Sequence, residues 1–285
     1  MHRVIGPEDP FWKNFETDFR KHGFLGSTVG EFRVHFRIVA KDWFDLADDL
    51  NELAQTIYIQ GTRSLSGKSL RDPAALGLQM MPRCLGGFQA SVLLCERGMS
   101  TEAMMLVRSI FETAFWMGYV VSDPANAIPQ FERETLESEI GLFQTAGRHL
   151  VGLPSSVTAQ VEQQVLEMKA RRDSLPKPPK PEKLAELAGY APAYFFYRQL
   201  SGAATHLSLK SIDSFLSRNE SGQVIGHQLG PDEVGVGRTI WLAIRSMILA
   251  VDALQRLLGT PEFDEELQRL NGTMEELGPW EPKPL

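Results

Sequence analysis

The chain has 285 residues, of which 43% are hydrophobic and 23% are charged, as in an ordinary globular protein. Its formal net charge of -7 argues against a general nucleic-acid-binding surface, which needs a basic excess. The first residues contain no apolar segment typical of a signal peptide. If Cys84 and Cys95 share one helix, they lie about 16 Å apart along it, too far for a disulfide. We therefore expect a cytoplasmic protein with reduced thiols.

Apolar residues recur at helical spacing in most windows, and no strong strand pattern appears. The sequence therefore predicts an all-α fold, a multi-helix bundle of about 8–10 helices with no significant sheet. Capping residues before proline, at Asp72-Pro73 and Asp123-Pro124, mark two of the helix starts. In chain order we expect helices over residues 11–22, 31–60, 73–97, 100–121, 124–150, 155–174, 181–189, 193–216, 233–258 and 261–277.

The clearest connection is the proline-rich segment 175–183, LPKPPKPEK, where proline blocks helix formation. We divide the chain into N-terminal helices packing on the core (1–70), a central helical bundle containing this connection (71–260), and a C-terminal helix with a loose tail (261–285). Residues 217–230, rich in Gly, Asn and Ser, are predicted to form a loop.

Residues 103–121 and 241–259 are each long enough to cross a membrane. Arg108 and Glu112 in the first segment would each cost roughly 2.5–3.5 kcal/mol near the bilayer centre. The second segment carries Arg245, Asp252 and Arg256 and fails the same test. Both segments are therefore interpreted as core helices, and no membrane partner is expected.

The segment 103–121 is the most informative part of the chain, because its polar residues fall within one strip roughly 140° wide on a helix. We expect Arg108 and Glu112 to pair across one turn and to be largely buried. Such a pair, framed by aromatic rings, is either a structural ion pair or the floor of a pocket. The strip contains Arg108, Ser109, Glu112, Thr113, Phe115, Trp116 and Tyr119.

A second polar face lies on the helix expected over 193–216. It is either a crossing point between helices or a polar pocket wall that faces the Arg108 helix. This face contains Tyr194, Tyr197, Arg198, Ser201, Thr205 and Ser208. From the two segments together, the candidate ligand-binding residues are Arg108, Glu112, Tyr119, Tyr194, Tyr197 and Ser201.

Common catalytic and cofactor motifs are missing from the sequence. It has no phosphate-binding glycine loop, no dinucleotide fingerprint and no G-x-S-x-G elbow. It has no C-x2-C, H-E-x2-H or E-x2-H element for a metal, and its six histidines are scattered. We therefore expect no metal and no cofactor.

Two spaced motifs carry a resemblance to known proteins. Gly98, Ala103, Arg108 and Glu112 form G-x4-A-x4-R-x3-E, and Y-R-x-L-S-x4-H follows downstream at Tyr197. Over residues 86–216 the chain resembles a bacterial family of helical proteins of unknown function, which implies a helical fold.

A remoter resemblance is to HEPN domains, which include defence-linked RNases that use R-x4–6-H on one helix, usually paired across a dimer. Here seven residues separate Arg198 from His206, so the two side chains would lie about 80° apart on an ideal helix. With six residues between them they would lie within about 20°. Arg198 and His206 are the catalytic candidates only under this resemblance.

Three classes of function remain open. The first is a non-catalytic protein associated with stress or defence, which binds a protein partner or a small ligand through the aromatic-polar strip. A homodimer is also expected under this class. The second is a HEPN-like, metal-independent RNase, the only reading in which RNA is a partner. The third is another enzyme built on Glu112 and a histidine, which the neighbouring arginine disfavours because a carboxylate beside an arginine suits ion pairing better than general-base catalysis. The sequence favours the first class.

Overall fold

The computed structural model describes residues 9–63, 67, 69, 71–149, 155–202, 211–212, 215–219, 221–227 and 230–279. These residues contain eleven α-helices and one small two-stranded sheet, so the predicted all-α class is confirmed, with more helices than the 8–10 expected. The helices are α1 (Phe11–His22), α2 (Val29–Val39), α3 (Lys41–Thr62), α4 (Pro73–Cys95), α5 (Ser100–Ser122), α6 (Pro124–His149), α7 (Ser155–Asp173), α8 (Pro181–Leu187), α9 (Tyr194–Leu200), α11 (Glu233–Leu258) and α12 (Asp264–Leu277).

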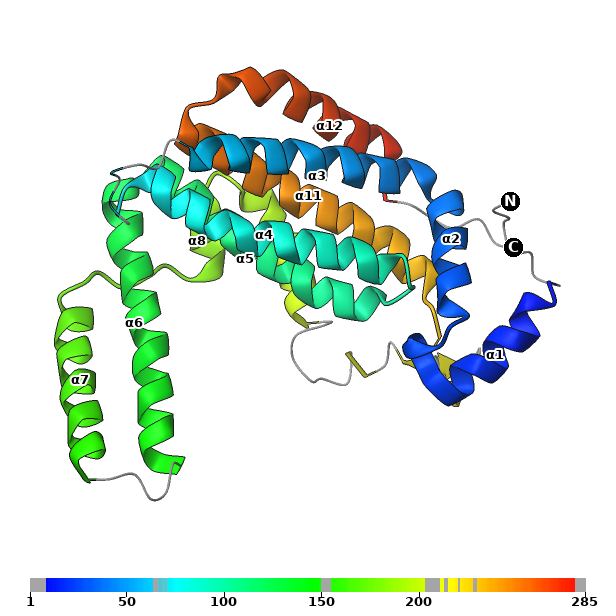
Figure 1. Ribbon diagram of the computed structural model, residues 1–285, viewed down its shortest axis with the longest axis horizontal. Helices are drawn as coiled ribbons and strands as arrows, with labels where there is room; N and C mark the ends of the chain where they lie inside the picture. Colours follow the sequence, from blue (N-terminus) through cyan, green and yellow to red (C-terminus); the bar gives the residue numbers. More distant parts are fainter. Residues whose placement is uncertain are drawn as a thin grey trace.

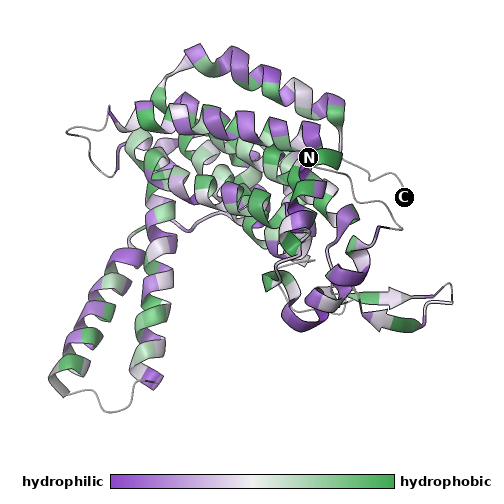
Figure 2. Ribbon diagram, turned by 45° about the vertical axis from the view of Figure 1, so that its right-hand side comes forward, coloured by the Kyte–Doolittle hydropathy of each residue, from purple (hydrophilic) through white to green (hydrophobic). Residues whose placement is uncertain are grey.

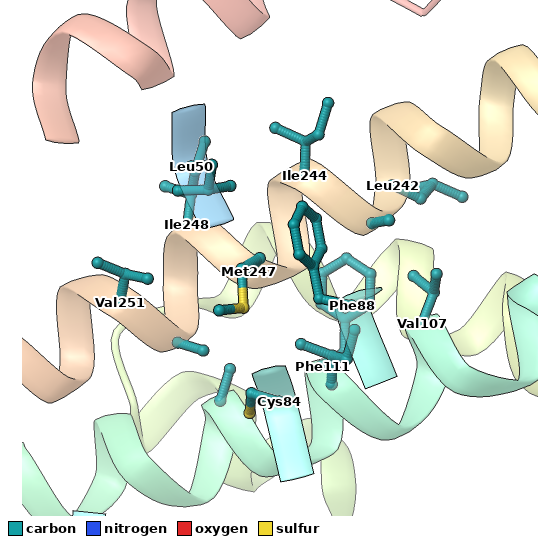
Figure 3. Packing of buried hydrophobic residues seen from close by; sticks show 14 of the residues in the cluster. Leu50, Cys84, Phe88, Val107, Phe111, Leu242, Ile244, Met247, Ile248 and Val251 are labelled. Carbon is teal, nitrogen blue, oxygen red and sulfur yellow. The ribbon is translucent and has the colours of Figure 1, made fainter. Parts of the chain in front are cut away.

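The body of the molecule is built around α11, which packs against α5, α4 and α3, while α12 covers the outside of α3 (Figure 1). Figure 3 shows how Phe88, Phe111 and Met247 from α4, α5 and α11 meet in this core. By length and composition α5 and α11 resemble membrane spans. However, 61% of the apolar window of α5 and 67% of that of α11 are buried inside the protein, as expected for core helices. Both cysteines lie on α4, buried and without a disulfide.

Two local signals fix the ends of α4. Asp72 caps its start, because one carboxylate oxygen accepts hydrogen bonds from the backbone N–H groups of Ala74 and Ala75, at 3.0 and 3.1 Å. Gly98 follows its end with a positive φ of 76°. A Cβ atom at this position would lie 2.4 Å from Cβ of Pro231, so glycine is required both by the backbone and by the close approach.

The single long helix predicted over 31–60 is wrong, because the structure breaks it at Ala40 into α2 and α3. Ala40 has non-helical backbone angles and is fully buried. Phe36 and Phe44 on either side of it are also fully buried, so the turn lets both short helices direct a ring into the core. Apolar spacing continues across this turn, which is why periodicity alone did not reveal it.

The helix predicted over 193–216 is also wrong at its end. Helix α9 covers Tyr194–Leu200, and Leu216–Arg218 forms strand β1, which pairs antiparallel with β2 (Val224–His227). The turn between the strands is closed by a hydrogen bond from the backbone N–H of Asn219 to the carbonyl of Gln223, at 3.0 Å. The residues predicted as a loop over 217–230 therefore contain part of a hairpin, which projects from the body in Figure 2.

Helices α6 and α7 form a long hairpin that extends away from the body (Figure 1). The proline-rich connection then returns the chain to α8, which packs closely on α5. At Gly118 of α5, a Cβ atom would lie 2.6 Å from the ring of Tyr190 and 2.9 Å from Cβ of Ala188. Only glycine lets the two segments approach this closely.

Candidate functional site

Arg108 on α5 is the centre of a polar cluster that joins α5 to α9. Its Nε donates a hydrogen bond to Oγ of Ser201 at 3.0 Å, and Nη2 donates to the hydroxyl of Tyr197 at 2.8 Å. Its Nη1 donates to Oε2 of Glu112 at 3.3 Å. The guanidinium also lies 4.9 Å from the centre of the Tyr197 ring, within cation–π distance. The polar face of α9 thus meets the Arg108 helix at a helix crossing, which is the first of the two interpretations that the sequence left open.

The expected Arg108–Glu112 pair forms, but it is not largely buried. The Arg108 side chain is 21% exposed and that of Glu112 is 37% exposed. Burial is confined to the α9 side of the cluster, where Tyr197 is 5% exposed and Ser201 is 8% exposed. Glu112 therefore faces partly outward, because α9 covers only one side of the polar strip.

The structure brings four of the six candidate ligand-binding residues into direct contact: Arg108, Glu112, Tyr197 and Ser201. Tyr194 joins them through its ring, which stacks on that of Tyr197 with 6.0 Å between centres. Burial raises the pKa of Tyr197, and the negative charge of Glu112 raises it further. The phenol therefore remains protonated at neutral pH.

Tyr119 is not part of this cluster. It lies eleven residues after Arg108 on the same helix, about 16 Å further along the axis. Its side chain is 3% exposed and its ring lies 6.3 Å from that of Trp116. Burial raises the pKa of Tyr119 as well.

A cavity of about 410 Å³ lies on the outward side of Glu112. Its apolar wall includes Trp116 of α5 and Phe131 of α6, whose rings meet edge to face with 5.1 Å between centres. Its charged lining consists of Arg83, Glu112 and Glu134. The volume is within the range of pockets that hold small molecules.

Two of the charged side chains that line this cavity, Arg83 and Glu134, are solvent-exposed, and neither has an ion-pair partner among the described residues. Arg83 donates from Nε to Oγ of Ser109 at 2.9 Å, and in the part of the chain that the structure describes no carboxylate pairs with it. Glu134 likewise has no described cation or hydrogen-bond donor beside its carboxylate. The Glu134 side chain is exposed, but its partial desolvation still raises the pKa of its carboxyl, and the charges of Glu112 and Glu137 raise it further.

The catalytic candidates under the HEPN resemblance are not brought together by any described geometry. Arg198 is on the exposed side of α9, and His206 lies outside the described residues. Across the described ranges, no three His, Cys, Asp or Glu side chains are grouped as they would be to hold a metal ion.

Comparison with known families gives one match. A model of DUF5677, described as a family of unknown function, matches residues 74–224, which is more than half of the chain. The chain belongs to the DUF5677 family. No curated protein and no solved structure matches it.

The DUF5677 match runs from the start of α4 to the first residue of β2. It therefore contains the Arg108 cluster, the cavity beside Glu112 and the α6–α7 hairpin. Helices α1 to α3 and the core helix α11 lie outside it. The family description names no activity, so the chemistry of the site has to be argued from its residues.

Sequence reasoning missed the α6 side of the cavity. Phe131 and Glu134 are on α6, and Arg83 is on α4. None of them is close in sequence to the polar strip of α5. The only available signal was the group of acidic residues over 132–139 in the middle of α6, which by itself predicts a solvated face.

Proposed function

We propose that this DUF5677 protein is a binding protein whose ligand is a small zwitterion, a molecule of the amino-acid type, held in the cavity beside Glu112. The observation that carries the proposal is the placement of two exposed, unpaired charges of opposite sign, the carboxylate of Glu134 and the guanidinium of Arg83, around one cavity with an aromatic wall. A ligand with an ammonium group at one end and a carboxylate at the other would match both charges.

The acidic side of the cavity favours a cation. Glu112 and Glu134 both line it, and the charge of Glu112 raises the pKa of Glu134 because the two carboxylates repel each other. A bound ammonium group would relieve this repulsion. The faces of aromatic rings also attract cations, and Trp116 and Phe131 form the neighbouring wall.

Arg108 has a positioning role in this proposal. Its hydrogen bonds to Ser201 and Tyr197 fix the guanidinium on the α9 side. The guanidinium in turn holds Glu112 at the edge of the cavity. The aromatic-polar strip of α5 would thus have two uses, a structural contact toward α9 and a ligand contact toward α6.

The test is thermal unfolding of the full chain with a panel of free amino acids and two sets of derivatives. Amides lack the carboxylate, and N-acetyl derivatives lack the ammonium group. We expect at least one free amino acid to raise the melting temperature. Neither its amide nor its N-acetyl derivative should raise it. At a ligand concentration 100 times Kd, the stabilisation is about 2.7 kcal/mol.

Two variants and one control connect the effect to the cavity. Glu134→Gln and Arg83→Met should each abolish the ligand-induced shift, whereas Glu139→Gln should retain it, because Glu139 is on α6 but does not line the cavity. If no zwitterion shifts the melting temperature, or if Glu134→Gln leaves the shift unchanged, the proposal is wrong.

The raised pKa of Glu134 gives a further expectation for the same assay. The ammonium group needs an ionised carboxylate, so binding should weaken as the pH falls through the raised pKa of Glu134. The loss should begin at a higher pH than for an ordinary glutamate. The control Glu139→Gln, which keeps the ligand-induced shift, should keep this pH dependence.

The alternative of a HEPN-like RNase that uses Arg198 and His206 has its own assay. Purified protein would have to cleave RNA without added metal, and both Arg198→Ala and His206→Ala would have to abolish the cleavage without changing the melting temperature. That result would replace the binding-protein proposal. The net charge of -7 and the seven residues that separate Arg198 from His206 favour the opposite result, no cleavage.

A further inference from the structure

A groove of about 750 Å³ lies between α9 and the first half of α11, and we call it the α9–α11 groove. Phe196 of α9 and Trp241 of α11 meet edge to face in its wall, with 5.3 Å between ring centres. Two further lining residues are strongly exposed, Phe195 at 60% and Val234 at 70%. Large apolar side chains that are exposed together along one groove are typical of a surface that binds another segment.

Two polar residues that line the groove have unused bonding capacity. The indole N–H of Trp241 is buried, and no described residue accepts a hydrogen bond from it. Arg238 donates to the side-chain oxygen of Gln199 at 2.5 Å, but among the described residues no carboxylate pairs with its guanidinium. A buried N–H group is costly unless it finds an acceptor. The groove therefore suits a segment that supplies carbonyl oxygens and a carboxylate.

The chain itself leads into this groove. Pro279, the last residue that the structure describes, is one of the lining residues. The residue before it is held in place, because the carbonyl of Gly278 accepts a hydrogen bond from Nε1 of Trp43 at 2.9 Å. The residues that follow Pro279 therefore start at the groove.

Helix α12 shows the direction in which the chain passes α11. Near the start of α12, Asp264 accepts a hydrogen bond from Gln255 at 2.5 Å. Near its end, Glu275 accepts one from Arg245 at 2.9 Å. Helix α12 thus runs antiparallel to α11, and its end lies on the same side of the molecule as the start of α11 (Figure 1). A chain that continues past Pro279 in this direction follows the groove toward the start of α11.

The sequence after Pro279 has the composition of a groove-binding segment. It reads WEPKP over 280–284. Its two prolines disfavour a helix and favour polyproline II, an extended conformation whose backbone carbonyls make no internal hydrogen bonds. Segments of this kind bind in aromatic-lined grooves, and Trp280 brings a large ring of its own.

The charges of the segment also occur in the order that the groove requires. Glu281 comes first after Pro279, and Lys283 follows about 6 Å later in polyproline II. Along α11 in the same direction, Arg238 comes first and Asp232 follows about 9 Å later. Both are lining residues, and the long side chains of glutamate, lysine and arginine can bridge the difference of about 3 Å.

We propose that residues 280–283 bind in the α9–α11 groove as an extended segment antiparallel to α11. The Trp280 ring joins the aromatic wall, and Glu281 pairs with Arg238. The backbone carbonyls of the segment supply acceptors at the wall that contains the Trp241 indole. This docking does not depend on the ligand proposed for the cavity between α5 and α6.

The test is disulfide trapping in the full chain. Val234→Cys and Lys283→Cys together place two thiols at the same end of the groove, and both native cysteines are buried. Under mild oxidation we expect an intrachain disulfide to form about tenfold or more faster than in the control pair, Met105→Cys with Lys283→Cys. Met105 is the matched control because it follows the lining residue Met104 and is 46% exposed, but does not line the groove.

Further changes in the Val234→Cys and Lys283→Cys background test the individual contacts. Trp280→Ala should lower the rate of disulfide formation to that of the control pair. Arg238→Glu should lower it by up to about fivefold, and Glu281→Arg added to it should restore the rate. An unchanged circular dichroism spectrum checks that each variant is folded. Equal rates in the two cysteine pairs, an unchanged rate in Trp280→Ala, or a disulfide between chains instead of within one would overturn the proposal.

Discussion

Replacing Arg108 by alanine measures how far the polar cluster holds α5 and α9 together. The substitution removes hydrogen bonds to Ser201 and Tyr197 and the ion pair with Glu112. It also removes a cation–π contact with the Tyr197 ring. Ser201 keeps a partner, because its hydroxyl also donates to the backbone carbonyl of Tyr197 at 2.9 Å.

The expected cost follows from these contacts and their exposure. A net hydrogen bond contributes about 0.5–1.5 kcal/mol, and an exposed ion pair contributes less than about 1 kcal/mol. Removing one member of a buried pair costs roughly 3–5 kcal/mol, because the other charge remains in the interior. Glu112 is 37% exposed, so water can hydrate its carboxylate once the arginine is gone. We therefore expect Arg108→Ala to cost about 2–3 kcal/mol.

Urea unfolding of purified variants gives this quantity directly, provided that the denaturant slope stays constant. Arg108→Lys should recover only part of the loss, because an ammonium group cannot reproduce the geometry of three donors. Glu112→Gln should cost less than about 1 kcal/mol. Arg108→Ala with an unchanged midpoint would show that the cluster does not stabilise the helix crossing. A loss above about 4 kcal/mol, matched by Glu112→Gln, would show that the pair behaves as buried.

Three further predictions concern other parts of the fold. Glu96 is 1% exposed and accepts hydrogen bonds from Nε of Arg33 and of Arg37, both at 2.6 Å. Replacing both arginines by alanine should therefore cost roughly 3–5 kcal/mol in urea unfolding. Glu96→Gln added to them should recover only part of this loss, because Arg37 also pairs with Asp48 at 2.6 Å. Hydrogen bonds from the backbone and side chain of Thr28 lower the pKa of Asp18 from 3.8 to about 2. The stability that this carboxylate contributes is therefore present above pH 3.8 and is lost as the pH falls through about 2. Asp18→Asn should flatten the acid-unfolding profile in this pH range. Gly118→Ala should cost about 1–3 kcal/mol in the same urea assay, because its methyl group would lie 2.6 Å from a tyrosine ring.

The parts of the fold that the sequence predicted well are those set by local chemistry. Helix α1 was predicted with its observed bounds, and the Asp-Pro pair at residue 72 placed the start of α4 correctly. In both cases the signal and the structure lie within a few residues of each other. The break at Ala40 was missed because it depends on the packing of Phe36 and Phe44 in the core, which no local pattern records.

The same distinction explains the candidate site. The contact between Arg108 and Glu112 follows from four-residue spacing on one helix, and it was predicted. The exposure of this pair was not predicted, because burial depends on which helix covers the polar strip of α5. Helix α9 covers the side with Tyr197, and the other side opens into the cavity with Glu134. Both the cover by α9 and the opening toward Glu134 depend on residues that are distant in sequence from Arg108.

Helix α6 links the cavity to the hairpin. Near its base it contributes Phe131 and Glu134 to the cavity beside Glu112, and its outer half contributes Phe143 to a groove between α6 and α7. Arg133, which precedes Glu134, fixes α6 to the end of α7. A change in the position of the hairpin therefore also displaces one wall of the cavity, so a ligand that favours one hairpin position is itself bound more tightly in that position, by the same factor.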